Sequence, residues 1–258
     1  VFSIASMTKP MTSVAILQLL EEGRLLLADP VSKFLPELAG MRVAASGDGP
    51  LVTRPARREP TIQDLLRHTS GLTYQDRGST PAHAQYPGSS ISACIKLSRE
   101  GFLSALANAP LLFEPGTGWE YGFSTDVLGL VVERITGKPL AEALRERIWQ
   151  PLGMMDTDFP LTGETTPRYA RALPKDPLNG AAQVVHHATG RATKWDSGGG
   201  GAVSTAADYL RFAEMLQQGG ALGSERLLGR KTVALMTSDH LPASFENRVA
   251  DAMDPAST

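Results

Sequence analysis

Ser6-Met7-Thr8-Lys9 lies at the start of an apolar run from Pro10 to Leu20, and this stretch decides the fold. The run predicts a helix, and positions i and i+3 of a helix lie on the same face. The Lys9 ammonium can therefore reach the Ser6 hydroxyl, and a serine needs such a neighbour to become a nucleophile. The alternative is a capping serine followed by a solvated lysine, because Ser-x-x-Lys alone also occurs by chance.

The residues around this pair indicate where the helix begins and ends. Pro10 lacks an N–H group, so it fits a first turn but would break a helix interior. Ser6 is therefore expected at or near the N-cap, where the helix dipole favours a developing oxyanion. Gly23 is expected to end the helix in a left-handed conformation.

The bulk composition excludes several classes of protein. The chain has 258 residues, 42% of them hydrophobic, which is enough for one large domain or two small ones. A net charge of −2 with interspersed signs makes nucleic acid an unlikely partner. The longest apolar run, Val14 to Leu20, is too short to span a bilayer. Cys94 is the only cysteine, which excludes an internal disulfide and most cysteine metal sites.

Helical signals dominate the rest of the chain, where capping residues, apolar stripes and stop residues follow one another. They predict helices at 61–68, 98–108, 124–136, 139–150, 205–217 and 230–236. Strand signals are few: 183–187 and 192–195 predict a hairpin, and 168–173 could add a strand. Residues 40–59 and 74–92 are rich in Gly, Pro, Ser and Arg and are expected to form long loops.

A second informative segment is Glu114-Pro115-Gly116-Thr117-Gly118-Trp119-Glu120-Tyr121-Gly122-Phe123-Ser124. Tyr121 stands in a loop just before a predicted helix, and loops held by helices commonly carry catalytic side chains. A tyrosine near a lysine can serve as a proton shuttle. On position alone, a core aromatic residue with a satisfied hydroxyl is an equally good interpretation.

Together these segments resemble the serine β-lactamase and penicillin-binding-protein superfamily, in the class C-like branch with the family VIII carboxylesterases. The resemblance covers nearly the whole chain. The segments that carry it are 2–9 (Phe-Ser-Ile-Ala-Ser-Met-Thr-Lys), 65–72 (Leu-Leu-Arg-His-Thr-Ser-Gly-Leu), 115–129, 151–157 and 198–209. The resemblance implies an α+β, β-lactamase/transpeptidase-like fold.

The resemblance also implies three catalytic roles. Ser6 would be the acylated nucleophile, and Lys9 the neighbouring base or proton relay. Tyr121 would match the tyrosine of the family's Tyr-x-Asn motif and act as general base. The sequence leaves open whether Lys9 or Tyr121 takes the first proton.

Two departures from the family pattern refine these expectations. Phe123 replaces the Asn of Tyr-x-Asn, which disfavours amide recognition and predicts an ester whose apolar part packs against this ring. The chain also lacks the family's Lys/His/Trp-x-Gly element, whose strand would supply one oxyanion N–H while Ser6 supplies the other. Residues 1–258 are therefore expected to be a mostly helical part of the domain, without most of the central antiparallel sheet. Such a part should be poorly stable alone, with Val14 to Leu20 exposed.

The remaining features have simpler interpretations. Gly198 to Gly201 lacks the spacing of a phosphate loop and is expected to be a flexible turn lining the site wall. His186 and His187 would point to opposite faces of a strand, which disfavours a metal site. His68 is expected to have a structural role, Asp64 to cap a helix, and Asp126 to be a helix-start acid.

The sequence thus predicts a serine hydrolase that cleaves small-molecule carboxylic esters through an acyl-enzyme on Ser6, without cofactor or metal. The alternatives are a β-lactamase, a D-alanyl-D-alanine carboxypeptidase or an acyltransferase of the same superfamily, and a non-catalytic penicillin-binding-like module. Cytoplasmic and periplasmic locations are both compatible with the sequence, which does not indicate an oligomeric state.

Overall fold

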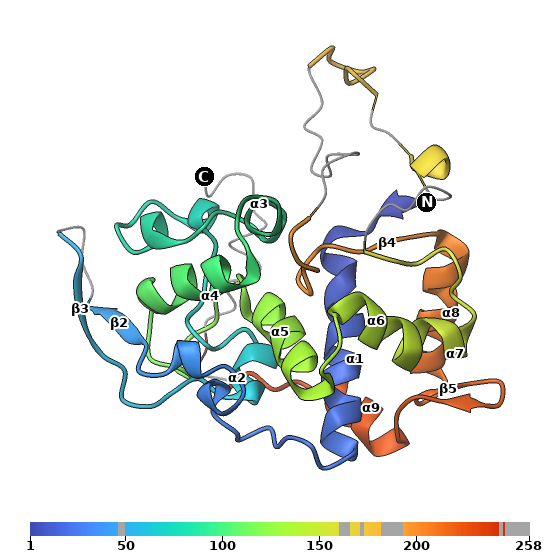
Figure 1. Cartoon of the computed structure of the whole chain (residues 1–258), viewed down its shortest axis with the longest axis horizontal. Helices are drawn as coiled ribbons and strands as arrows, with labels where there is room; N and C mark the ends of the chain where they lie inside the picture. Colours follow the sequence, from blue (N-terminus) through green and yellow to red (C-terminus); the bar gives the residue numbers. More distant parts are fainter. Residues whose placement is uncertain (46–49, 160–165, 171–172, 182–192, 243–244, 246–258) are drawn as a thin grey trace.

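A computed structural model describes residues 1–45, 50–159, 166–170, 173–181, 193–242 and 245. Helix α1 (Thr8–Glu21) runs through the middle of the molecule (Figure 1). The start and the end of α1 agree with the sequence signals. Pro10 is its third residue, where a missing N–H costs little. Gly23, one residue past the C-cap, has φ +68°, the left-handed conformation expected after a helix end.

The apolar stretch of helix α1, Val14 to Leu20, is surrounded by other parts of the chain. It packs against α5 (Ser124–Thr136) and α6 (Leu140–Leu144). Between Val14 and Leu19 every apolar side chain is buried, and Leu20 is half-buried. The expectation that Val14 to Leu20 would be exposed was therefore wrong, because other helices of this chain cover the run.

Three other helices begin at the expected caps, whereas α5 follows Phe123 without a side-chain cap. Thr61 and Asp64 form a capping box, and the Ser98 and Thr205 side chains accept hydrogen bonds from Gly101 N and Asp208 N. The remaining helices are α2 (Ile62–Leu66), α3 (Ser90–Lys96), α4 (Arg99–Asn108), α7 (Gln150–Leu152), α8 (Ala206–Gln217) and α9 (Arg230–Met236). A π-helical turn, Arg145–Trp149, joins α6 to α7. The expectation of a loop over residues 74–92 was wrong at its end, where a helix begins at Ser90.

The described residues contain three small antiparallel sheets of two strands each. Strand β1 (Phe2–Ser3) pairs with β4 (Val203–Ser204), which brings the start of the chain beside residue 203. The other pairs are β2 (Arg42–Ala45) with β3 (Val52–Pro55), and β5 (Ala221–Leu222) with β6 (Glu225–Arg226). The expectation of a long loop over residues 40–59 was wrong, because β2 and β3 form a hairpin there.

Two predicted strand regions lie largely outside the described residues. The hairpin around 183–195 falls mostly on residues 182–192, together with His186 and His187, and is not described. In the 168–173 region, Thr166–Arg168 form a 3-10 turn and residues 171–172 are outside the description. The mostly helical α+β fold class nevertheless agrees with the described elements.

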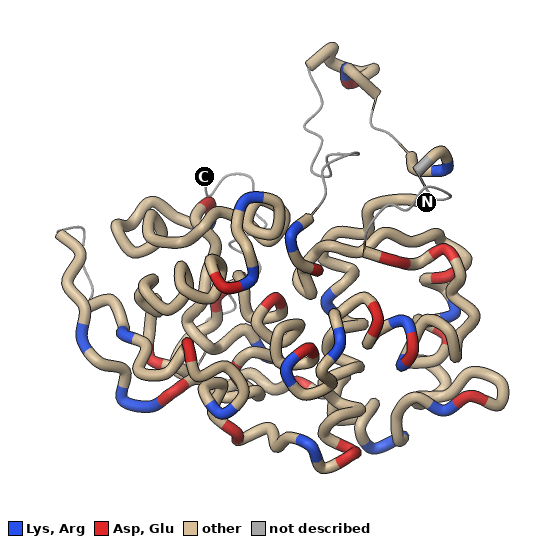
Figure 2. Tube along the Cα trace, viewed as in Figure 1, with Lys and Arg blue, Asp and Glu red and all other residues tan. Residues whose placement is uncertain are grey.

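Helices α2 to α4 and the β2–β3 hairpin lie on one side of α1, and α7 to α9 lie on the other (Figure 1). One continuous hydrophobic core joins the two sides through α1 and α5. Positively and negatively charged residues are interspersed along the trace of the described residues (Figure 2). Over the described residues, no helix is both long and apolar enough to cross a membrane.

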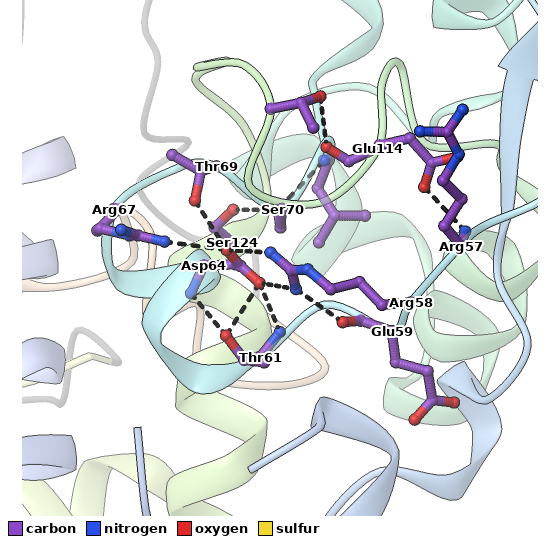
Figure 3. A network of polar contacts seen from close by, with 12 residues as sticks. Arg57, Arg58, Glu59, Thr61, Asp64, Arg67, Thr69, Ser70, Glu114 and Ser124 are labelled. Carbon is purple, nitrogen blue, oxygen red and sulfur yellow. Dashed lines mark hydrogen bonds and ion pairs between the residues drawn. The ribbon is translucent and has the colours of Figure 1, made fainter. Parts of the chain in front are cut away.

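An ionic network around one buried carboxylate fixes the segment that follows α2 (Figure 3). The Asp64 carboxylate, fully buried, accepts hydrogen bonds from Arg58 at 2.5 Å and from Arg67 at 3.2 Å. Thr61 and Thr69 also donate to this carboxylate. Burial raises the pKa of Asp64, but the hydrogen bonds from Arg58 and Thr61 outweigh burial and the net pKa is lowered.

Candidate active site

Ser6 lies in a short 3-10 turn, Ala5–Met7, between strand β1 and helix α1. Its side chain is exposed, and the preceding residue, Ala5, has φ +42°, a conformation that L-residues with side chains rarely adopt. Thr8 stabilises this turn, since its hydroxyl donates to Ala5 O at 2.7 Å and accepts from Ala202 N at 3.1 Å. The backbone before the helix is thus held in a strained form that presents Ser6 to solvent.

Lys9 occupies the first turn of α1, one helical turn after Ser6. Its Nζ donates to Ser6 Oγ at 3.2 Å, as the i, i+3 spacing predicted. The same Nζ donates to the carbonyl oxygen of Gly199 at 2.6 Å. Lys9 is therefore held between the candidate nucleophile and a turn 190 residues away in sequence.

Tyr121 comes from the loop before α5 and meets the same serine. Its Oη lies 2.5 Å from Ser6 Oγ, and Lys9 Nζ lies 4.4 Å from the centroid of its ring. The ring stacks on His68 with centroids 5.0 Å apart and meets Tyr74 edge-on at 5.7 Å. A side chain fixed in this way can move a proton without reorganising, which is the geometry that general base catalysis needs.

His68 supports Tyr121 through the stacked ring contact, which is the structural role that the sequence predicted. It has φ +58°, and its carbonyl accepts a hydrogen bond from Glu120 N at 2.9 Å, directly before Tyr121. Burial lowers the pKa of His68 to about 3, and the positive charge of Lys9 acts in the same direction. The imidazole therefore stays neutral at ordinary pH. Among the described residues, its buried Nδ1 has no hydrogen-bond partner.

Phe123 corrects one expectation. Its side chain is fully buried, and its ring meets Tyr74 at 4.7 Å and Phe102 at 5.2 Å, both edge-on. The residue precedes α5, and its ring points into the core beneath the site. The prediction that this ring packs against a substrate was wrong; it contributes to the aromatic core that supports the Tyr121 loop.

The turn that contains Gly199 is packed more tightly than the expectation of a flexible turn suggested. Gly198 to Gly201 are all buried, and Gly198 O accepts a hydrogen bond from Thr12 Oγ1 at 3.0 Å. An added Cβ at Gly198 would lie 2.8 Å from Thr125 O, so α5 approaches the bare backbone. The run of glycines is the one sequence signal that could have indicated this close packing.

A cavity of about 240 Å³ opens beside Lys9 and His68. Its walls are mainly apolar and include residues of α1 and α9, among them Leu17, Leu235 and Met236. Ser6 and Tyr121 do not line this cavity, which meets the candidate site at Lys9 and His68. Apolar walls of this kind suit the apolar part of a small organic molecule. Within the described part of the chain, no group of three His, Cys, Asp or Glu side chains is placed to hold a metal ion.

Comparison with known proteins shows which family the whole chain resembles. The Beta-lactamase family model matches residues 1–253. Esterase EstB of Burkholderia gladioli is 38% identical over 84% of this chain and 57% of its own length. Monacolin J acid methylbutanoyltransferase of Aspergillus terreus is 32% identical over 97% of this chain and 60% of its own length.

A solved structure matches this chain over about the same share of its length as the sequence relatives do. Unliganded simvastatin synthase (LovD) from Aspergillus terreus superposes with a TM-score of 0.79 at 29% identity, covering 98% of this chain and 61% of the other. The chain thus spans less than two thirds of the length of each of these relatives.

Proposed function

The chain belongs to the beta-lactamase family. We propose that it forms the active site of a serine hydrolase, which cleaves carboxylic esters through an acyl-enzyme. One observation carries the proposal. Ser6 Oγ is contacted at once by Tyr121 Oη at 2.5 Å and by Lys9 Nζ at 3.2 Å. A hydroxyl beside two proton-transferring groups is the arrangement of an activated nucleophile.

In the proposed reaction, Tyr121 starts as the phenolate beside the Lys9 ammonium, Ser6 Oγ attacks the ester carbonyl carbon, and the Ser6 proton passes to the Tyr121 oxygen. The shorter of the two contacts with Ser6 Oγ, 2.5 Å against 3.2 Å, favours Tyr121 as the first base. The C–O bond to the alcohol breaks, and the leaving alkoxide takes the proton from Tyr121. A water molecule then gives its proton to Tyr121 and attacks the acyl carbon, and Ser6 recovers its proton as the acid leaves.

The preference for an ester rests on the third position of the tyrosine motif. With the Phe123 ring buried, this position places no side-chain amide near Ser6 to bind the amide of a lactam or peptide substrate. Relatives named as esterases, EstB among them, support the same preference. We expect cephalosporin turnover to be far slower than turnover of a short-chain aryl ester.

Acyl transfer to an alcohol other than water is the second candidate function. It is favoured by the likeness to a methylbutanoyltransferase and to simvastatin synthase. The chemistry differs only in which nucleophile attacks the acyl-enzyme. Added alcohol acceptors that form a new ester at the expense of the free acid would indicate transfer.

The proposal is tested with a fluorophosphonate probe and p-nitrophenyl butyrate on the full-length protein. We expect one probe per molecule, attached to Ser6, together with ester turnover. Ser6→Ala should lose both, whereas Ser104→Ala, which changes an exposed serine of α4, should keep both. Ester turnover by Ser6→Ala at the wild-type rate would refute the proposal. A folded wild-type protein that neither labels nor turns over would instead support a non-catalytic module.

A further inference from the structure

Asp126 is a fully buried carboxylate in the first turn of α5. Three donors from two other segments meet it. Ser90 Oγ donates to Oδ2 at 2.6 Å, Ser197 Oγ to Oδ1 at 2.5 Å, and Gly199 N to Oδ1 at 3.1 Å. A helix-start acid usually faces solvent, so this position requires an explanation beyond the helix dipole.

The carboxylate is tied to Lys9 through one residue. Gly199 gives its N–H to Asp126 and its carbonyl oxygen to Lys9 Nζ, at 2.6 Å. A Cβ added to Gly199 would lie 2.4 Å from Asp126 Oδ2, so the carboxylate approaches the bare backbone of the turn. Asp126 thereby fixes the acceptor that holds the Lys9 ammonium.

The charges around Asp126 agree with this arrangement. Burial raises the pKa of Asp126, while the positive charge of Lys9 and the three hydrogen bonds oppose the rise. From the other elements, Tyr74 faces Asp126 through Ser90, with a Tyr74–Ser90 contact of 2.7 Å, and Cys94 lies on α3. Burial and then the Asp126 charge raise the pKa of the Cys94 thiol to about 12, so it stays protonated. Among the groups that act on the pKa of Asp126, Lys9 supplies the positive charge, which favours the ionised carboxylate.

We propose that Asp126 is a positioning residue, which orients the Gly199 carbonyl toward Lys9 and supplies the buried negative charge that keeps Lys9 beside Ser6. This inference rests on the proposed function, because it assigns a role within the same acylation step. Asp126 does not touch the reacting atoms. Its effect should therefore appear in the rate and pH dependence of acylation.

Asp126→Asn keeps the shape of the side chain and removes its charge. In the full-length protein we expect fluorophosphonate labelling of Ser6 and kcat to fall about 10- to 100-fold, with KM little changed. Removing a buried negative charge favours the deprotonated form of nearby groups. The acidic limb of the kcat/KM profile should therefore move to lower pH.

Asp64→Asn is the matched control, since Asp64 is equally buried but is bound by Arg58 and Arg67. It should lower the melting temperature and leave the acidic limb in place. Asp126→Asn behaving in this way would overturn the inference and reduce Asp126 to a structural residue.

If Asp126→Asn does not fold, Ser197→Ala decides, because it removes one donor and keeps the charge. It should slow labelling several-fold, and a wild-type labelling rate for this variant would overturn the inference. Failure of the wild-type protein to label would instead count against the proposed function.

Discussion

At the residue scale, the ring and the hydroxyl of Tyr121 have separable duties. The ring packs on His68 and Tyr74, whereas the hydroxyl contacts Ser6 Oγ. Tyr121→Phe should therefore keep the fold and lose the base, and we expect acylation to slow by about 10²- to 10⁴-fold. Stopped-flow acylation and thermal melting measure the two effects separately. Acylation at an unchanged rate in this variant would transfer the role of first base to Lys9.

His68 makes a prediction about stability. Its folded pKa of about 3 lies below the unfolded value of 6.5, so the unfolded state binds more protons as the pH falls through 6.5. The contribution of His68 to the free energy of unfolding should thus be fully present above pH 6.5. It should decline as the pH falls from 6.5 toward 3, by at most about 1.4 kcal/mol per pH unit. The imidazole is half-buried, so the observed slope should be smaller.

His68→Asn removes this titration and retains a residue type that tolerates the positive φ of this position. Urea unfolding at pH 7 and pH 4.5 measures the change in stability for both proteins. The variant should lose less stability than the wild type on acidification. An equal loss in both would show that other groups govern the acid response.

The site was predictable to the extent that its chemistry is local. Ser6 and Lys9 meet because of helical spacing, which a sequence displays directly. Tyr121 joined them only through a family resemblance, because no local rule connects residues 115 positions apart. The buried orientation of Phe123 and the role of Gly199 were not predictable, since a motif gives the position of a residue and leaves the direction of its side chain open.

At the scale of elements, the loop that carries Tyr121 depends on a close backbone approach. A Cβ added to Gly122 would lie 2.4 Å from Thr73 Cα and 2.6 Å from Thr73 C, and backbone atoms cannot move aside as a side chain can. Gly122→Ala should therefore displace Tyr121 from Ser6. We expect labelling of Ser6 to slow at least tenfold and the melting temperature to fall by several degrees, as overpacking commonly costs about 1–3 kcal/mol.

Gly101→Ala provides the control for this prediction. Gly101 lies in α4, where an added Cβ would meet only side-chain atoms at ordinary contact distances, the Ser98 hydroxyl at 3.4 Å and Leu97 Cβ at 3.8 Å. Ala also favours a helix by about 1 kcal/mol over Gly. This variant should label normally and melt at the same or a higher temperature. Equal behaviour of the two variants would argue against a special role for the approach at Gly122.

Helices were easier to predict than strands for a physical reason. Three of the predicted helices carried a side-chain cap in their own sequence, at Thr61, Ser98 and Thr205, although α5 begins without one. The β2–β3 hairpin is held partly from outside, since Ala44 N donates to Leu111 O at 2.8 Å and Leu111 N donates to Arg42 O at 2.8 Å. A tertiary contact of this kind has no signature in the Gly- and Pro-rich segment 40–59.

At the scale of the whole molecule, the site unites segments from three regions of the chain. Ser6 and Lys9 come from its start, Tyr121 and Asp126 from its middle, and the Gly199 turn follows more than 70 residues later. Strand β1 pairs with β4 immediately beside the Ser6 turn, which fixes the first region against the last. Because α1 and α5 also belong to one hydrophobic core, unfolding of either helix should dismantle the site.

The final prediction compares residues 1–258 alone with the full-length protein. The continuous core and the buried α1 lead us to expect that this part unfolds in one cooperative transition. Its acylation should nevertheless be slow, because the chain has no Lys/His/Trp-x-Gly element to provide a second oxyanion donor, and losing one such donor costs about 10²- to 10³-fold. Differential scanning calorimetry tests the cooperative unfolding, and the rate of fluorophosphonate labelling tests the slow acylation. A labelling rate for residues 1–258 equal to that of the full-length protein would show that the oxyanion donors lie within this chain.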